Sequence, residues 1–324
     1  MIVLVYVLIA AAVAFAYSLG AHYTGACMGM PYAAGAVRLV PALAIMAPFV
    51  LVGAVFASGA VEATVGHGIL MATTVAVPLA VAIVVAAFLL TSAYNFATIP
   101  TSTIQILVFS AVGAGLADGV GIQWGTIEAL VGVWAIAPFA ACGLGFAFAR
   151  LIDRLTPQDP DGDRRVALTH HAAFALVGIG SAVSFAMGAN DVANSSGPLV
   201  MTGLFGLTVA GLVGGAGMAL GVLTWGRPLL QRVAFDVVHL DARTAAASQL
   251  ALAAVILVSV SFGYFTSMNQ ALVGAMIGAG LSRGGATIIR RSVRSILSGW
   301  ALGPVSGAAL GFVLVLLFRG LHVL

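Results

Sequence analysis

The chain has 324 residues, of which 61% are hydrophobic and 7% are charged, and its formal net charge is +3. This composition excludes a soluble domain and predicts an all-α polytopic membrane protein that resides in the lipid bilayer and binds no nucleic acid. The basic residues are all arginine, and the two cysteines, Cys27 and Cys142, indicate neither a disulfide framework nor a metal site.

Ten apolar segments follow one another along the chain, each near the roughly 20 residues that a spanning helix needs. Some are short enough to be broken or re-entrant. The N-terminal segment lacks a basic n-region, so we interpret it as a membrane helix and not as a cleaved signal peptide. The segments are 2–19, 38–58, 68–93, 101–117, 127–152, 170–187, 205–225, 245–263, 266–282 and 297–318.

Two related polar decapeptides, Gly20–Gly29 and Gly188–Gly197, interrupt the apolar sequence after the first segment of each half. The positions that differ in chemistry pair His22 with Asn190, Tyr23 with Asp191, and Ala26 with Asn194. The decapeptides are too short to cross a bilayer, so we predict that they are re-entrant elements. A duplicated polar, glycine-bearing interruption of this kind indicates a transporter binding site.

The duplication extends over most of the chain. Blocks beginning at Thr101 and Thr266 match with an offset of 165 residues, Trp134 matches Trp300 at 166, and the decapeptides match at 168. We therefore predict a first repeat over residues 1–152, a linker over 153–169 and a second repeat over 170–324.

Arginines are concentrated in the links on one side of the ten crossings, including the central linker. Positively charged links stay in the cytoplasm, so we predict a cytoplasmic linker and both termini outside. Glu62 and Asp118 fall in arginine-free links, which places them near the outer surface. Each half then has an odd number of crossings, so the two repeats have inverted topology.

Asp191 is the one carboxylate predicted at membrane depth, where an ionisable side chain by default marks a functional site. It can also cap the half-helix that begins at Val192, and the two roles are compatible. His22 in the first copy is a candidate proton carrier, and a neutral, hydrogen-bonded core histidine is the alternative. We expect ion coupling at Asp191, Asn190 and His22.

Hydroxyl-rich segments begin at Thr101 and Thr266, where each is able to cap a helix. Together with the decapeptides they form two inverted pairs of helix starts. Helix N-termini carry unpaired N–H groups and a positive dipole end, so they bind anions without a basic side chain. The predicted substrate-binding residues are Asn194, Ser195, Ser196, Gly197, Thr24, Gly25, Thr101, Ser102, Thr103, Thr266, Ser267 and Asn269.

The GANDVANSSGP motif at 188–198, the Thr-Ser segments and the paired W-x-x-x-P blocks resemble the inorganic phosphate transporter (PiT) family over essentially the whole chain. The resemblance implies a dimeric secondary transporter that moves a tetrahedral oxyanion with sodium or protons. Family members usually carry the GANDVAN-like signature in both halves, whereas the first copy here is GAHYTGACMG. This degenerate first half is similar to the sulfate permease branch, which implies proton coupling.

We therefore predict a secondary active transporter in the cell membrane that imports an oxyanion, with sulfate and proton symport as the first choice. Sulfate offers only acceptors and suits a site of N–H and O–H donors, whereas hydrogen phosphate gains from an acceptor such as Asp191. Sodium- or proton-coupled phosphate transport is the first alternative, and a passive anion channel is the second. We expect a homodimer without enzymatic activity or cofactor. A sodium site at Asn190 and Asp191 belongs to the sodium-coupled alternative.

Overall fold

The computed structural model describes residues 2–97, 101–155, 162–236, 242–284 and 290–323, and these residues are almost entirely helical. The predicted linker 153–169 lies partly outside them. An isolated antiparallel bridge joins Leu70 to Ile122. The helices are α1 (Ile2–His22), α2 (Thr24–Ala33), α3 (Leu39–Phe56), α4 (Gly59–His67), α5 (Val77–Phe96), α6 (Thr103–Asp118), α7 (Trp124–Leu155), α8 (Gly162–Asp191), α9 (Ala193–Met201), α10 (Leu207–Asp236), α11 (Ala242–Ser261), α12 (Met268–Leu281) and α13 (Arg290–Gly320).

Each of the ten predicted apolar segments corresponds to a helix. Within the described ranges, 8 helical stretches are long and apolar enough to cross a membrane, and α6 and α12 are shorter apolar helices. The count of ten crossings is therefore approximate, but the prediction of an all-α polytopic membrane protein is confirmed.

The two decapeptides form broken helices. Tyr23 separates α1 from α2, and Val192 separates α8 from α9, so each short helix directly continues the long one before it. Backbone hydrogen bonds from Tyr23 N to Leu19 O and from Cys27 N to Tyr23 O lie on either side of the first break. The predicted half-helices thus exist, but each is joined to the preceding helix by a single residue.

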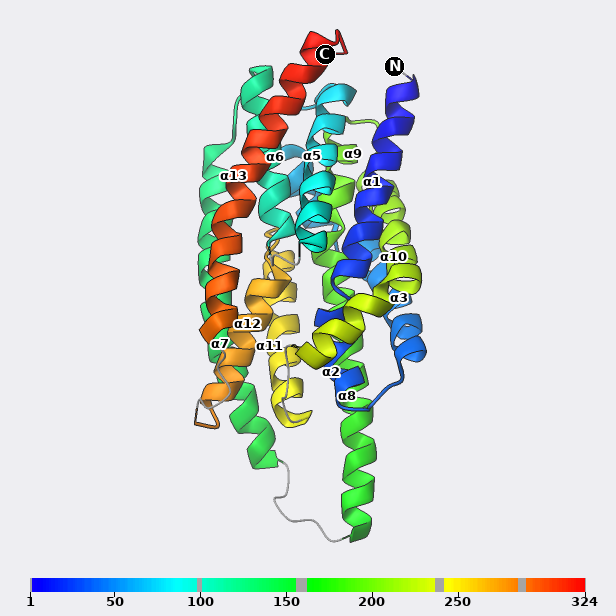
Figure 1. Ribbon diagram of the computed structural model, residues 1–324, viewed down its shortest axis with the longest axis vertical. Coiled ribbons are helices and arrows are strands. Elements are labelled where there is room, and N and C mark those ends of the chain that lie inside the picture. Colours follow the sequence, from blue (N-terminus) through cyan, green and yellow to red (C-terminus); the bar gives the residue numbers. More distant parts are fainter. Residues whose placement is uncertain (1, 98–100, 156–161, 237–241, 285–289, 324) are drawn as a thin grey trace.

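Two helical hairpins enter the molecule from opposite ends. In Figure 1, α5 and α6 lie together in the upper half, whereas α11 and α12 lie together in the lower half. The side chain of Ser102 caps α6 by accepting a hydrogen bond from Gln105 N, and Gly119 ends α6 in the left-handed conformation that favours glycine. The connections at Thr101–Ser102 and Phe265–Ser267 therefore bring the hydroxyl-rich segments toward the middle of the molecule.

The packing of the helices confirms the inverted repeats, because each half packs against the other in equivalent pairs. Helix α1 packs against α10 as α8 packs against α3, and α6 packs against α13 as α12 packs against α7. The N- and C-termini lie at the same end of the molecule (Figure 1). Each half crosses the membrane an odd number of times, and the two halves run in opposite directions. Both termini therefore lie at the same end of the molecule.

Glycines at equivalent positions allow these helix pairs to touch backbone to backbone. A Cβ built on Gly113 of α6 would lie 2.0 Å from Ala308 O of α13, and one on Gly278 of α12 would lie 1.8 Å from Cys142 O of α7. The α1–α10 and α3–α8 pairs meet in the same way at Gly20 and Gly188. Small residues supply this close approach in lipid, where apolar burial alone does not drive helices together.

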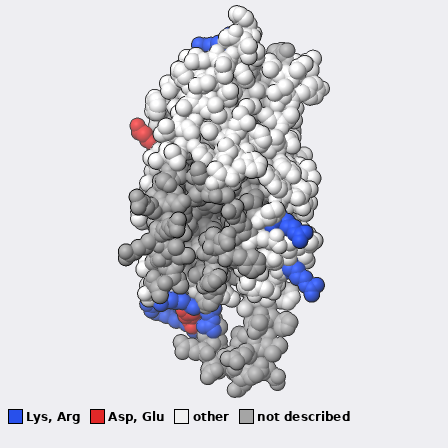
Figure 2. All heavy atoms as spheres, viewed as in Figure 1, with Lys and Arg blue, Asp and Glu red and all other residues white. Residues whose placement is uncertain are grey.

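Charged side chains are sparse over the described surface. Figure 2 shows a broad, nearly uncharged upper part, with most of the basic side chains of this face nearer the lower end. This distribution is expected of a protein that presents its sides to hydrocarbon.

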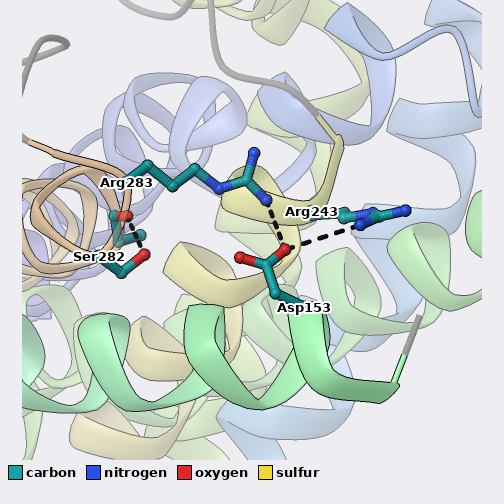
Figure 3. Close-up of polar contacts among 5 residues, drawn as sticks. Asp153, Arg243, Ser282 and Arg283 are labelled. Carbon is teal, nitrogen blue, oxygen red and sulfur yellow. Dashed lines mark hydrogen bonds and ion pairs between the residues drawn. The ribbon is translucent and has the colours of Figure 1, made fainter. Parts of the chain in front are cut away.

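An ion-pair cluster connects three helix ends at the end of the molecule opposite the two termini. Asp153 Oδ1 near the end of α7 lies 2.8 Å from Arg283 Nη2, just after α12, and 3.7 Å from Arg243 Nη1 at the start of α11 (Figure 3). About a third of each of these side chains is exposed. Partly exposed pairs of this kind contribute only about 0–1 kcal/mol.

Substituting Asp153→Asn should therefore lower the free energy of unfolding by no more than about 1 kcal/mol. Thermal unfolding of the purified protein in detergent measures this change. Asp118→Asn, which removes the pair with Arg319 at the other end of the molecule, is the matched control. A loss of several kcal/mol confined to Asp153→Asn would contradict this small expected effect.

Candidate functional site

The two helix breaks release backbone donors in the middle of the molecule. Within the described ranges, the N–H groups of Thr24–Ala26 in the first copy, and of Ala193 and Asn194 in the second, have no backbone acceptor. No side chain caps either short helix, so Asp191 does not have the capping role considered as an alternative. Free N–H groups at a helix start are suited to an anion.

Asn190 and Asp191 join the second break to the tip of the α11–α12 hairpin. Asn190 Nδ2 donates to Thr266 O at 2.8 Å, and Thr266 N donates to Asn190 Oδ1 at 3.0 Å. Asn190 Nδ2 also donates to Asp191 Oδ2 at 3.1 Å. All three residues are fully buried, so the amide of Asn190 fixes the position of the carboxylate relative to the hairpin tip.

Tyr23 and Asn194, one from each break, meet at the tip of the other hairpin. The Tyr23 hydroxyl lies 2.9 Å from Thr103 Oγ1, and Asn194 Nδ2 donates to the same oxygen at 3.4 Å. The Tyr23 hydroxyl is also within hydrogen-bonding reach of the Asp191 carboxyl group. Tyr23 and Asp191 occupy equivalent positions in the two copies. The structure therefore places the phenol of one copy beside the carboxyl group of the other.

His22 adjoins this polar centre on the side of α12. Its Nε2 lies 3.3 Å from Asn269 Nδ2, and its ring meets the Tyr23 ring edge-on with centroids 4.6 Å apart. The histidine therefore contacts Tyr23, which in turn reaches Asp191.

Several buried polar atoms around the centre have no hydrogen-bond partner within the part of the chain that the structure describes. They are Asp191 Oδ1, Asn194 Oδ1, Gln105 Oε1, Thr266 Oγ1, Ser267 Oγ, and both Gln270 Oε1 and Nε2. Buried polar groups are normally paired, and unpaired ones call for a ligand, an ion or water. Arginine is not among the buried residues of the described ranges, so a bound anion would meet only neutral donors and helix dipoles.

Other predicted residues are near the breaks but have their side chains engaged elsewhere. The Thr24 hydroxyl donates to Ala21 O and Gly226 O, and the Ser195 and Ser196 hydroxyls both donate to Val192 O. Gly197 faces the Val65 side chain of α4. Gly25, Thr101 and Ser102 are buried, and Ser102 caps α6 as the alternative reading expected.

The structure adds polar residues that the sequence did not single out. Gln105 and Gln270 occupy the same position in the two matching blocks, and that equivalence was the available signal. Gln249 of α11 donates to Ala26 O and Cys27 O and so holds α2. Glu62, expected near the outer surface, is instead 1% exposed. An external link and a short buried helix have the same polarity in the sequence, so the pattern could not separate them.

An inverted-repeat membrane protein with broken helices that meet at a buried polar centre has the architecture of a secondary transporter. The phosphate transporter family profile matches residues 19–311. The sulfate permease CysP of Bacillus subtilis is 28% identical over 306 residues, which cover 94% of this chain and 85% of the relative. A probable low-affinity inorganic phosphate transporter of Mycobacterium leprae is 27% identical over 321 residues, covering 94% of this chain and 76% of the relative.

A solved structure titled as the sodium-dependent phosphate transporter has the same fold, with a TM-score of 0.87 and 22% sequence identity. The match covers 98% of this chain and 99% of that chain. The chain therefore belongs to the phosphate transporter family, and it is a multi-pass membrane transporter and not an enzyme.

Proposed function

We propose that this protein imports sulfate by proton symport. The observation that carries the proposal is the asymmetric centre, in which Asp191 of one copy lies opposite Tyr23 of the other. A paired-carboxylate site suits two cations, whereas one carboxylate beside a phenol provides a single titratable acid. The 28% identity to a relative named sulfate permease over 94% of this chain supports the same substrate.

In this proposal the anion is held between the two helix breaks and the two hairpin tips. Its donors are the free N–H groups of the breaks, Asn194 and the hydroxyls of Thr103, Thr266 and Ser267. The set is neutral, so binding is moderate and release remains fast. Ser195, Ser196, Gly197, Thr24, Gly25, Thr101, Ser102 and Asn269 contribute by shaping the breaks and tips around the anion.

Asp191 carries the coupling proton in this mechanism, held by Asn190, while His22 reaches it through Tyr23. Protonation removes the negative charge that would otherwise repel a dianion in a buried site. Rocking or sliding of one helix bundle then alternates access to the site. The two repeats span 1–152 and 170–324, the linker 153–169 faces the cytoplasm, the termini face outward, and the transporter works as a homodimer.

Phosphate is the alternative substrate, and two observations support it. A relative at 27% identity is a probable inorganic phosphate transporter, and the unpaired Asp191 Oδ1 is a suitable acceptor for the hydroxyl of hydrogen phosphate. In that case sodium would bind at Asn190 and Asp191. A passive channel is disfavoured, because a buried carboxylate obstructs the flow of anions.

Uptake into proteoliposomes tests the proposal. Labelled sulfate should accumulate above its external concentration when a pH gradient, acidic outside, is imposed, and a sodium gradient should add nothing. Excess unlabelled sulfate should compete fully and phosphate weakly. Accumulation that needs sodium, or stronger competition by phosphate, would support the alternative, and downhill flux alone would support the channel.

A further inference from the structure

Glu62 is a second buried carboxylate, outside the site described above. It lies in the first turn of α4, a short helix that is not one of the candidate membrane spans, and it is 1% exposed. Helix α4 packs against α9, with Val65 against Gly197 and Gly66 against Val200. Among the acidic residues whose burial the structure describes, Glu62 and Asp191 are buried.

The surroundings of Glu62 suit an uncharged carboxylic acid. Its Oε1 has no hydrogen-bond partner in the described ranges, and a Cβ on Gly211 of α10 would lie 3.3 Å from that oxygen. The hydroxyls of Ser196 and Ser58 are within hydrogen-bonding reach. Both already donate to backbone carbonyls, Ser196 to Val192 O and Ser58 to Ala54 O. Their oxygen lone pairs therefore remain to accept a hydrogen bond from protonated Glu62.

Helices α8, α9, α10 and α11 pack against α4. Helix α9 carries no titratable side chain, and the described titratable side chains of the other three are His171, Asp191, Arg227 and Arg243. Arg227 is about 24 Å along α10 from Gly211. Burial raises the pKa of Glu62 to about 7. None of those charged groups is among the causes of the shift.

Glu62 is connected to the centre through α9. The Ser196 hydroxyl beside the carboxyl group donates to Val192 O, the residue that separates Asp191 from α9. Three helices, α4, α9 and α10, enclose the carboxyl group. A displacement of α9 against α10 would therefore change the exposure of Glu62 and the geometry at Asp191 together.

We infer that Glu62 is a second proton-binding site of the transport cycle. This inference rests on the proposed proton-coupled import of sulfate. Sulfate carries two negative charges, and one uncompensated charge moving against 100 mV reduces accumulation by about 50-fold. One proton on Asp191 and one on Glu62 balance the dianion, so the transported set, two protons and one sulfate, carries no net charge.

Proton and sulfate fluxes in proteoliposomes test the assignment, with an entrapped pH indicator and a potassium diffusion potential. The wild-type protein should move two protons per sulfate, and its accumulation should not respond to a negative interior. Glu62→Gln should move one proton per sulfate. Its accumulation should fall about 50-fold when an interior potential of −100 mV is imposed. Glu128→Gln, which alters the exposed glutamate of α7, should match the wild type.

The outcomes distinguish a failure of the proposed function from a failure of the assignment of Glu62. A wild-type protein that moves sulfate without protons overturns the proposed function and this inference with it. Proton coupling in the wild type that is unchanged in Glu62→Gln overturns the assignment of Glu62 alone. A sodium requirement that disappears in Glu62→Gln would show that the carboxylate binds sodium, which also overturns it.

Labelling of the wild-type protein gives a measurement that does not depend on a variant folding. A hydrophobic carbodiimide modifies protonated carboxyl groups in apolar surroundings, and mass spectrometry locates the product. Glu62 should be labelled at acidic pH, and labelling should decline as the pH rises through about 7. An unlabelled Glu62 at acidic pH would overturn the inference.

Discussion

Asp191→Asn should weaken the response of sulfate accumulation to a pH gradient, because only the proton on Glu62 then remains coupled, and it should leave slower downhill exchange. Asparagine preserves the size of the side chain and one oxygen acceptor for Asn190, but it cannot bind and release a proton. A pH difference of one unit is worth about 1.4 kcal/mol per proton, so accumulation should fall about tenfold for each proton that is uncoupled. Uptake of labelled sulfate at several imposed pH gradients measures the change.

Asp118→Asn is the matched control for this experiment. Asp118 ends α6 and pairs with Arg319 near the surface, with 19% of its side chain exposed. It should accumulate sulfate as the wild type does. If Asp191→Asn retained full gradient-driven accumulation, Asp191 would not be the coupling residue. A loss of both accumulation and exchange would instead indicate a structural role for the carboxylate.

Gly278→Ala should destabilise the protein strongly and stop transport. The added methyl group would lie 1.8 Å from Cys142 O, a backbone atom that cannot rotate away. Helix α12 would have to separate from α7, which costs about 3 kcal/mol for an overpacked contact. Because α12 follows directly after Thr266 and Ser267, the hairpin tip at the site would move as well. Thermal unfolding in detergent and sulfate uptake measure the two effects.

Gly143→Ala is a close control, because Gly143 follows Cys142 on α7 and a Cβ there would meet open space. It should leave stability within about 0.5 kcal/mol of the wild type, as is usual for surface substitutions. Equal unfolding temperatures for the two variants would contradict the proposed backbone contact between α7 and α12.

The duplicated decapeptides meet at the buried polar centre that we propose as the site. Polar residues within membrane helices usually have a functional role. This rule selected His22, Asn190, Asp191 and Asn194. The structure brings His22, Asn190 and Asn194 to hairpin tips, where Asn269, Thr266 and Thr103 are their partners, and Asp191 accepts a hydrogen bond from Asn190. Their function in transport stays a prediction.

The sequence could not distinguish a crossing helix from a hairpin arm. Helix α5 has 20 residues with a mean hydropathy of 2.2, enough for a span, yet Figure 1 shows it beside α6 in one half of the molecule. Hydropathy reports the transfer of each side chain out of water. It does not report whether lipid or protein surrounds the helix afterwards.

By itself, the sequence determined that the protein is helical, embedded in the membrane and built from two inverted repeats, because composition and repeated motifs are properties of the chain alone. The tertiary structure decided which polar groups meet. Tyr23 and Asp191 are distant in the chain but adjacent in space, and Glu62 is buried only because α4 packs against α9 and α10. Those contacts depend on close backbone packing at glycines, and periodicity and hydropathy contain no information about which helices will approach each other.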